Sequence, residues 1–238
     1  MQKKVTAIVL AAGKGSRMNS DTPKQYLTLL GKPVLFYSLQ AFESSNVDNI
    51  ILVTGSGEQE YCKKEIIEKY QLKKVTHIVE GGAERYHSVW HGLMAAKDAE
   101  YVLIHDGARP LISSQIINKA ILAVKETGAC VVGMPVKDTI QIADENKAIM
   151  STPDRSRTWI AQTPQCFAFE LAMSSYNNAI ASNDTKITDD AMVIRKYGNS
   201  SVTMIEGSYE NIKVTTPEDI AVAECFLTES RKSLISNA

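Results

Sequence analysis

The chain has 238 residues, long enough for one large α/β domain and short for two, so we expect a single domain over residues 1–238. Its 26 Lys and Arg residues nearly balance 27 Asp and Glu residues, which argues against nucleic acid or a membrane surface as a partner. The cysteines, Cys62, Cys130, Cys166 and Cys225, are far apart, which argues against disulfides and a zinc site. No apolar run is long enough for a signal peptide or a membrane span, so we expect a cytoplasmic protein.

The chain opens with a predicted strand that ends in an anion-binding type of loop. Residues 5–12 form a short apolar run rich in branched side chains, typical of a strand buried on both faces, and Gly13 and Gly15 end it. Backbone N–H groups come free at the end of such a strand, and small residues let an anion approach them. Three cations follow within a few residues: Lys14, Arg17 and Lys24. The loop is therefore suited to a polyphosphate.

Two better-known phosphate loops do not fit this stretch. A P-loop requires G-x-x-x-x-G-K-[ST], and neither glycine is followed by that spacing. The dinucleotide fingerprint G-x-G-x-x-G fails at its third glycine, where the chain has Met18, and residues 19–23 favour a longer, irregular loop. A G-x-G alone fits an ordinary strand-to-helix turn equally well. The three cations and the Pro23-Lys24 pair favour the functional interpretation.

Strand-like and helix-like runs then alternate, which predicts a mostly parallel sheet with helices on both faces. Pro33 suits the first turn of a helix whose apolar face carries Leu35, Phe36, Leu39 and Phe42. Further helices are predicted near 58–70, 85–96, 114–126, 168–181, 189–197 and 217–228, and strands near 50–54, 75–79, 101–105, 130–135 and 201–206. The residues after 228 are expected to fray.

Residues 136–160 break this alternation. They contain two polar, alternating segments around the turn-like Asp144-Glu145-Asn146, which is the pattern of a β-hairpin. Such a hairpin has no evident sheet to join in a parallel α/β order. We therefore expect it to project as an arm.

Two further polar stretches follow predicted strands, and ligands of open parallel sheets bind at the carboxyl ends of the strands. In the first, Gly81 and Gly82 allow close approach of the backbone and Ser88 lies about one turn into the next helix, so a nucleotide base can rest there. The same glycines also fit a simple helix-entry turn. His87 and His91 are four residues apart, but the H-E-x-x-H motif has Glu where this chain has Ser88, so we assign both to the surface or to packing.

The second polar stretch is LIHDGARP, residues 103–110. Asp106 stands where a buried strand ends, and from there a carboxylate can hold a Mg²⁺ ion that also bridges phosphate oxygens. The alternative is that Asp106 caps the next turn and pairs with Arg109. These residues alone do not decide between the two.

Several segments, in order along the chain, resemble one enzyme family. They are LAAGKGSRM, PKQYL, GGAERYHSVWHGL, VLIHDGARP, PVKDTI, AQTPQCF, ITDDA and EGSYENIKVTTPEDIAVAE. Together they span about residues 5–227 and are similar to the 2-C-methyl-D-erythritol 4-phosphate cytidylyltransferases, a family of sugar-phosphate nucleotidyltransferases. The resemblance implies a Rossmann-like nucleotidyltransferase fold with a protruding β-hairpin arm.

The resemblance also implies a reaction and a site. The reaction is transfer of the cytidylyl group of CTP to 2-C-methyl-D-erythritol 4-phosphate, with Mg²⁺, in non-mevalonate isoprenoid biosynthesis. The residues that would act catalytically are Arg17, Lys24 and Lys213. Those that would bind CTP are Ala11, Ala12, Gly13, Lys14, Gly15, Gly82 and Ser88. Those that would meet the second substrate are Asp106, which also holds the metal, Arg109, Thr139, Arg155 and Thr163. In the family, the arm that carries Thr139 and Arg155 reaches across a homodimer.

Three other interpretations are weighed against this one. Ribitol-5-phosphate cytidylyltransferases share the PKQ, HD-x-x-RP, PDRS and QTPQ stretches, but GGAERYHSVWHGL and ITDDA favour the methylerythritol branch. A catalytically inactive nucleotide-binding module is disfavoured by the joint presence of Arg17, Lys24, Asp106 and Lys213. A dinucleotide-dependent reductase is disfavoured because Gln40 stands where an acidic residue is expected.

Overall fold

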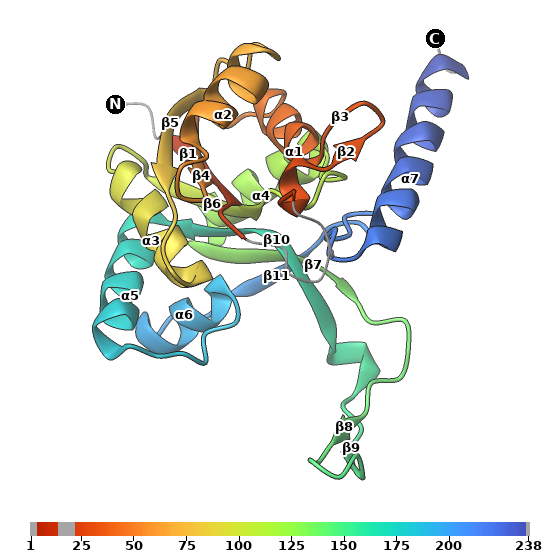
Figure 1. The fold of residues 1–238 in the computed structure, drawn as a ribbon. Helices are drawn as coiled ribbons and strands as arrows, with labels where there is room; N and C mark the ends of the chain where they lie inside the picture. The colour runs from red at the N-terminus through yellow and green to blue at the C-terminus, as the bar shows by residue number, and fades with distance from the viewer. Residues whose placement is uncertain (1–3, 14–21, 237–238) are drawn as a thin grey trace.

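The structure is a computed structural model that describes residues 4–13 and 22–236. Its centre is a seven-stranded sheet with helices on both faces (Figure 1). In spatial order the strands are β11 (Thr203–Glu206), β7 (Ala129–Pro135), β10 (Trp159–Ala168), β6 (Tyr101–Asp106), β1 (Val5–Ala11), β4 (Asn49–Thr54) and β5 (Val75–Glu80). Every neighbouring pair is parallel except the two that contain β10. The predicted mostly parallel α/β sheet is therefore confirmed.

The central strands bring their carboxyl ends to one edge of the sheet. β1 and β6 are buried on both faces because their runs are mainly apolar and branched. In the register of the sheet, Leu10 of β1 pairs with Asp106 of β6, and Ala11 of β1 pairs with Thr54 of β4. Thr54 in turn pairs with Glu80 of β5. Residues that follow these four strands therefore meet at the same edge.

Most of the helices form a layer on each face of the sheet, whereas the C-terminal helix packs through Ala223 in a small separate core with Leu29 and Val34. The helices are α1 (Val34–Glu43), α2 (Gln59–Tyr61), which continues as a π-helical segment (Cys62–Glu68), α3 (Arg85–Ala95), α4 (Ser114–Thr127), α5 (Phe169–Ser182), α6 (Asp190–Tyr197) and α7 (Pro217–Ser236). α1, α4 and the π-helical segment pack in one core with Val9, whereas α3, α5 and α6 pack in the other with Ile8. Because successive residues of a strand point to opposite faces, β1 contributes to both cores.

The helix boundaries follow from capping residues. Ser113 accepts a hydrogen bond from the backbone N–H of Ile116 at the start of α4, and Gly128 ends that helix with a φ of 74°. The predicted α1 face is confirmed, since Leu35, Phe36, Leu39 and Phe42 are all buried. None of the helices within the described residues combines the length and apolar character that a membrane span requires.

The strand β10 and the end of α7 differ from the sequence-based expectation. The antiparallel strand β10 was missed, because its sequence carries Thr163, Pro164 and two glutamines in place of a continuous apolar run. The register shifts between Ala161 and Gln165, and such an irregularity accommodates a proline that has no N–H to donate. α7 extends to Ser236, so the fraying expected after residue 228 is wrong up to that point.

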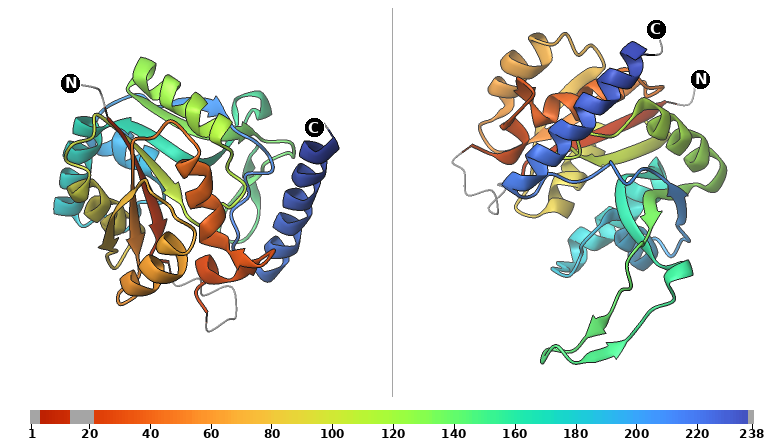
Figure 2. Two further views of the ribbon diagram at one scale, coloured as in Figure 1. Left: turned by 90° about the horizontal axis from the view of Figure 1, so that it is seen from above. Right: turned by 90° about the vertical axis from the view of Figure 1, so that its right-hand side faces the viewer.

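The predicted hairpin is present and projects from the body of the molecule. Its strands are β8 (Ile142–Ala143) and β9 (Ile149–Ser151), and a 3₁₀ turn (Arg155–Arg157) leads back into β10. Asp144 stabilises the turn by accepting hydrogen bonds from the backbone N–H groups of Asn146 and Ala148. Figure 1 and the right-hand view of Figure 2 show this arm, residues 136–160, standing away from the sheet and helices.

Candidate active site

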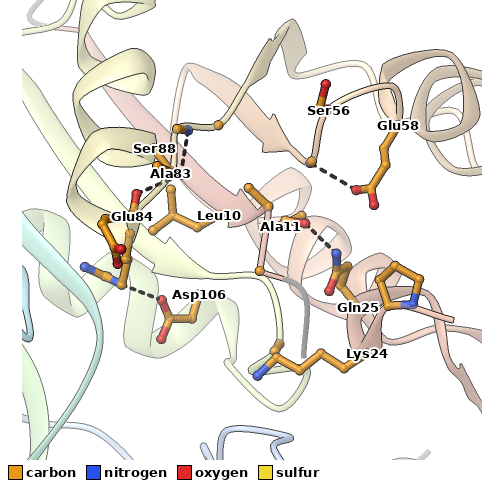
Figure 3. Close-up of a pocket in the computed structure, with 18 of the residues that line it drawn as sticks. Leu10, Ala11, Lys24, Gln25, Ser56, Glu58, Ala83, Glu84, Ser88 and Asp106 are labelled. Atoms are coloured by element: carbon orange, nitrogen blue, oxygen red, sulfur yellow. Dashed lines mark hydrogen bonds and ion pairs between the residues drawn. The ribbon is translucent and has the colours of Figure 1, made fainter. Parts of the chain in front are cut away.

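A cavity of about 990 Å³ lies at the edge where β1, β4, β5 and β6 end (Figure 3). The predicted nucleotide-binding residues in its wall are Ala11, Ala12, Gly13, Gly82 and Ser88. The predicted charged residues in its wall are Lys24, Asp106 and Lys213. Segments from both ends of the chain thus converge on one cavity, as expected for a ligand site of an open parallel sheet.

Of the other predicted site residues, Lys14, Gly15 and Arg17 fall outside the described residues. Thr163 is buried behind Asp106, and Arg109 donates from Nη1 to the backbone oxygen of Asn211 at 2.7 Å. Thr139 and Arg155 are exposed on the arm and do not line the cavity.

Lys24 is positioned by a short 3₁₀ turn, Lys24–Tyr26, that follows the first loop. The buried Gln25 side chain donates to the backbone oxygen of Ala11 at 2.6 Å and so ties this turn to the end of β1. The Lys24 ammonium donates to the backbone oxygen of Val214 at 3.0 Å. Because Val214 follows Lys213, this bond joins the two segments that carry the predicted cations. Gln25 stood inside the PKQ motif, but its anchoring role was missed.

The Gly81-Gly82 stretch packs tightly against its neighbours. A Cβ at Gly81 would lie 2.5 Å from the Ala12 Cβ, and one at Gly82 would lie 2.4 Å from the His87 Cβ. Ser88 accepts a hydrogen bond from the Gly82 backbone N–H at 3.1 Å, which holds this stretch against α3. Packing therefore requires both glycines, whether or not a base binds there.

The two histidines of this stretch have structural partners. His87 completes a capping box with Glu84 at the start of α3. His91 lies with Nδ1 2.7 Å from the backbone oxygen of Glu80. These contacts agree with their assignment to packing.

Asp106 is the charged centre of the cavity wall. Its Oδ1 lies 3.2 Å from Nε of Arg85, and its Oδ2 lies 2.7 Å from Nζ of Lys213. Burial alone would raise the pKa of Asp106, but the charges of Arg85 and Lys213 outweigh burial and hold this pKa well below its usual value. In the alternative interpretation Asp106 caps the next turn and pairs with Arg109; the ion pairs of Asp106 are instead with Arg85 and Lys213, and Arg109 donates from its backbone N–H to the Asp106 backbone oxygen.

Arg85 was not predicted as a site residue, although it lines the cavity. Its Nη1 and Nη2 lie 2.7 and 2.8 Å from the two carboxylate oxygens of Asp190, a bidentate pair. Tyr176 also donates its hydroxyl to Asp190, which is fully buried. Arg85 and Asp190 each stood inside a quoted motif, but they are 105 residues apart and nothing in the sequence paired them.

Thr163 fixes the backbone of Asp106 from behind. Its hydroxyl oxygen accepts from the Asp106 backbone N–H at 3.1 Å and lies 3.0 Å from Nδ1 of His105. Burial lowers the pKa of His105 to about 3, so its ring is neutral at neutral pH and can accept the Thr163 proton. The Thr163 hydroxyl is thus already engaged on both sides.

The donor set of the cavity fits a hard divalent cation bound with a nucleotide. The described residues contain no cluster of three or more His, Cys, Asp or Glu side chains that could hold a metal alone. Mg²⁺ usually keeps several waters and takes one or two carboxylates plus substrate phosphates, and the Asp106 carboxylate in the cavity wall supplies such a ligand.

Comparisons with known proteins identify the family. The family model described as IspD, 2-C-methyl-D-erythritol 4-phosphate cytidylyltransferase, matches residues 5–229. The chain belongs to this family. The 2-C-methyl-D-erythritol 4-phosphate cytidylyltransferase of Lachnoclostridium phytofermentans is 51% identical over 227 residues, which cover 95% of this chain and 97% of the relative. That of Alkaliphilus oremlandii is 48% identical over 231 residues, covering 96% and 97%.

Solved structures of the 2-C-methyl-D-erythritol 4-phosphate cytidylyltransferase family share the fold. The 4-diphosphocytidyl-2C-methyl-D-erythritol synthase from Anaerococcus prevotii superposes with a TM-score of 0.83 at 34% identity, covering 95% of this chain and 96% of that one. The family enzyme from Thermus thermophilus gives a TM-score of 0.75 at 27% identity, covering 93% and 98%. The predicted Rossmann-like nucleotidyltransferase fold is confirmed.

Proposed function

We propose that this chain transfers the cytidylyl group of CTP to 2-C-methyl-D-erythritol 4-phosphate. A phosphate oxygen of the second substrate attacks the α-phosphorus of CTP, and the bond from that phosphorus to the bridging oxygen of the β-phosphate breaks. Pyrophosphate leaves with the electron pair, and the product is 4-diphosphocytidyl-2-C-methyl-D-erythritol. One observation carries the proposal: Lys24 and Lys213, from opposite ends of the chain, line one cavity together with Asp106.

The residues would act by positioning and by neutralising charge. Two polyanions must be held in line while charge develops on the α-phosphate and on the leaving group, and fixed cations stabilise that charge. We assign this role to Lys24, Lys213 and Arg17. Backbone and side chains of residues 11–15 would cradle the triphosphate, and Gly82 and Ser88 would contact the cytidine. No covalent enzyme intermediate is needed.

Asp106 would hold Mg²⁺ together with phosphate oxygens of CTP. The ion would neutralise charge on the triphosphate when bound. Asp106 forms an ion pair with Arg85 through one oxygen and with Lys213 through the other, and each oxygen keeps a further lone pair for a metal ligand bond. Family members are nucleotidyltransferases that generally depend on a divalent cation, and Mg²⁺ is our choice among such ions.

The second substrate would be held partly by a partner subunit. Arg155 and Thr139 are exposed on the arm, outside the cavity of their own chain. The arm also exposes five large apolar side chains: Ile140, Ile142, Ile149, Met150 and Ile160. Such a surface on a projecting hairpin suits a homodimer in which each arm reaches the partner's cavity. Within the chain, Arg109 and Thr163 do not line the cavity, and they would support that site from behind, Thr163 through the backbone of Asp106 and Arg109 through that of Asn211. Residues 1–238 would act as one nucleotidyltransferase domain.

The direct test is pyrophosphate release by the purified protein. We expect release to require CTP, Mg²⁺ and 2-C-methyl-D-erythritol 4-phosphate together. Ribitol 5-phosphate serves as the competing acceptor, and UTP as the competing donor. Faster turnover with ribitol 5-phosphate would move the assignment to that enzyme class. Tight binding of CTP without release with any polyol phosphate would indicate an inactive nucleotide-binding module.

A further inference from the structure

Arg85 bridges two carboxylates of different kinds. All three guanidinium nitrogens are engaged: Nη1 and Nη2 by the fully buried Asp190, and Nε by Asp106 at 3.2 Å, the dashed line at Asp106 in Figure 3. Asp106 lines the cavity, whereas Asp190 does not. A planar fork of this kind has a fixed geometry, so the position of Asp190 determines where the Nε–H points.

The Asp190 side chain is itself held in place by its neighbours. It is the first residue of α6, and Asp189 caps that helix by accepting from the backbone N–H of Met192. The Gln165 side chain of β10 accepts from the Ala191 N–H at 2.7 Å and donates to Asp189 at 3.2 Å, which locks the start of α6 to the sheet. Tyr176 of α5 donates its hydroxyl to Asp190. The anchor is thus held by three elements, and none of these contacts involves a cavity residue other than Arg85.

The other ion pair of Asp106 is of a different kind. Lys213 contributes a single flexible ammonium, also lines the cavity, and would be drawn to the phosphates of a bound nucleotide. Arg85 cannot follow it, because two of its three nitrogens remain on Asp190. When Lys213 turns to the ligand, Arg85 is therefore the contact that keeps the Asp106 carboxylate in place.

We propose that Arg85 is a positioning residue, anchored on Asp190 and Tyr176, that sets the orientation of the Asp106 carboxylate in the cavity. The inference deepens the proposed function and rests on it for the identity of the ligands. It explains why the GGAER, HDGARP and ITDDA segments meet through side chains in this fold. It assigns Arg85 no direct contact with substrate.

The test is a double-mutant cycle of Arg85→Gln and Asp106→Asn, read as kcat and KM of pyrophosphate release. Removing an outer partner of a ligand commonly costs about 10- to 100-fold in activity or metal affinity, and we expect a loss of that size for Arg85→Gln alone. The loss is expected in the same parameter as for Asp106→Asn. In the Asp106→Asn background, Arg85→Gln should cost less than about 2-fold more, because the residue acts through a carboxylate that is no longer there. Independent, multiplying losses would overturn the inference and indicate direct contact with substrate or a general folding defect.

Two milder variants and a control keep the test decisive. Arg85→Lys retains the charge but cannot bridge both carboxylates, so it should be impaired, and full activity in this variant would also overturn the inference. Tyr176→Phe removes one hydroxyl from the anchor, and should give a smaller loss in the same parameter. Arg195→Gln replaces an exposed arginine on α6 and should match the wild type. Thermal melts identify any variant that is unfolded.

Binding separates this inference from the proposed function. The same cycle is measured by calorimetry with CTP and Mg²⁺ and no second substrate. If the wild type binds CTP but releases no pyrophosphate, the proposed reaction fails, while non-additive losses of affinity would still support the role of Arg85. Additive losses of affinity would contradict that role whatever the reaction.

Discussion

The cavity wall and the arm are built in opposite ways. Around the cavity, distant parts of the chain hold one another: Lys24 bonds to the backbone of Val214, 190 residues away, and Arg85 to Asp190, 105 residues away. On the arm, Arg155 makes a contact of 3.5 Å with the nearby backbone oxygen of Lys137. The part of the site proposed for the triphosphate is therefore assembled within one chain. The part proposed for the second substrate needs another surface beside the arm.

The largest expected effect comes from the cavity cations. Replacing Lys24 or Lys213 with Ala removes a charge that would stabilise the transition state, and should cut turnover by on the order of 10²-fold or more without unfolding the protein. Lys63→Ala, an exposed lysine on the π-helical segment, is the matched control. Steady-state kinetics measure the loss of turnover, and a thermal melt shows whether each variant is folded. If the turnover of Lys24→Ala equals that of Lys63→Ala, Lys24 in the cavity wall has no catalytic role.

Asp106→Asn should weaken the proposed metal site. The substitution keeps the size of the side chain and removes the charge, so the Mg²⁺ concentration needed for half-maximal activity should rise. The measurement is a Mg²⁺ titration at saturating CTP. An unchanged titration curve would assign Asp106 to a purely structural role as the partner of Lys213 and Arg85.

The apolar surface of the arm should control assembly rather than folding. Ile149 and Met150 are each 67% exposed, so Ile149→Ser with Met150→Ser should lower dimer affinity while leaving the thermal unfolding of the monomer nearly unchanged. Sedimentation over a dilution series measures the affinity. Leu122→Ser, at a 70% exposed position on α4, controls for the loss of an exposed apolar side chain. Equal dimer affinity in the wild type, the arm variant and the Leu122→Ser control would mean that the arm has no role in assembly.

The smallest expected effect concerns thiol reactivity. Cys225 is exposed, whereas Cys62, Cys130 and Cys166 are buried, and burial raises the pKa of Cys62 to about 11. In the folded protein a maleimide should therefore modify Cys225 quickly and the other three thiols only on unfolding. Mass spectrometry of timed samples gives the sites. Rapid modification of Cys130 or Cys166 would mean that β7 and β10 separate at the end of their pairing opposite to the arm.

Much of the cavity could be predicted because its residues lie in local patterns. The apolar run of residues 5–12 predicts a buried strand, and the carboxyl ends of parallel strands lie at one edge of a sheet. The sequence alone therefore placed the stretches around Gly82 and Asp106 close together. The hairpin at 136–160 was predictable for the same kind of reason, since alternation and a turn signal are both local.

What could not be predicted depends on contacts between distant residues. Nothing in the sequence set Arg85 and Asp190 apart from their neighbours in the motifs, because a bidentate pair between two distant helices leaves no periodic signal. β10 was missed because Pro164 and its polar neighbours lack the pattern of a strand. They fit into the sheet because the register of β10 against β7 shifts at this point. The partners of Asp106 were also unforeseen, since Lys213 reaches it from the far end of the chain.

The contrast between the two regions is tested most directly by mixing subunits. Lys24→Ala damages the cavity wall and Arg155→Ala damages the arm, and each homodimer should be nearly inactive. If the arm serves the partner's cavity, a mixed dimer has one site with both defects and one intact site. Random pairing on coexpression should then restore activity to about a quarter of all sites. Mixed dimers that form and recover no activity would contradict the account, and Arg155 would then serve its own chain or have no part in the reaction.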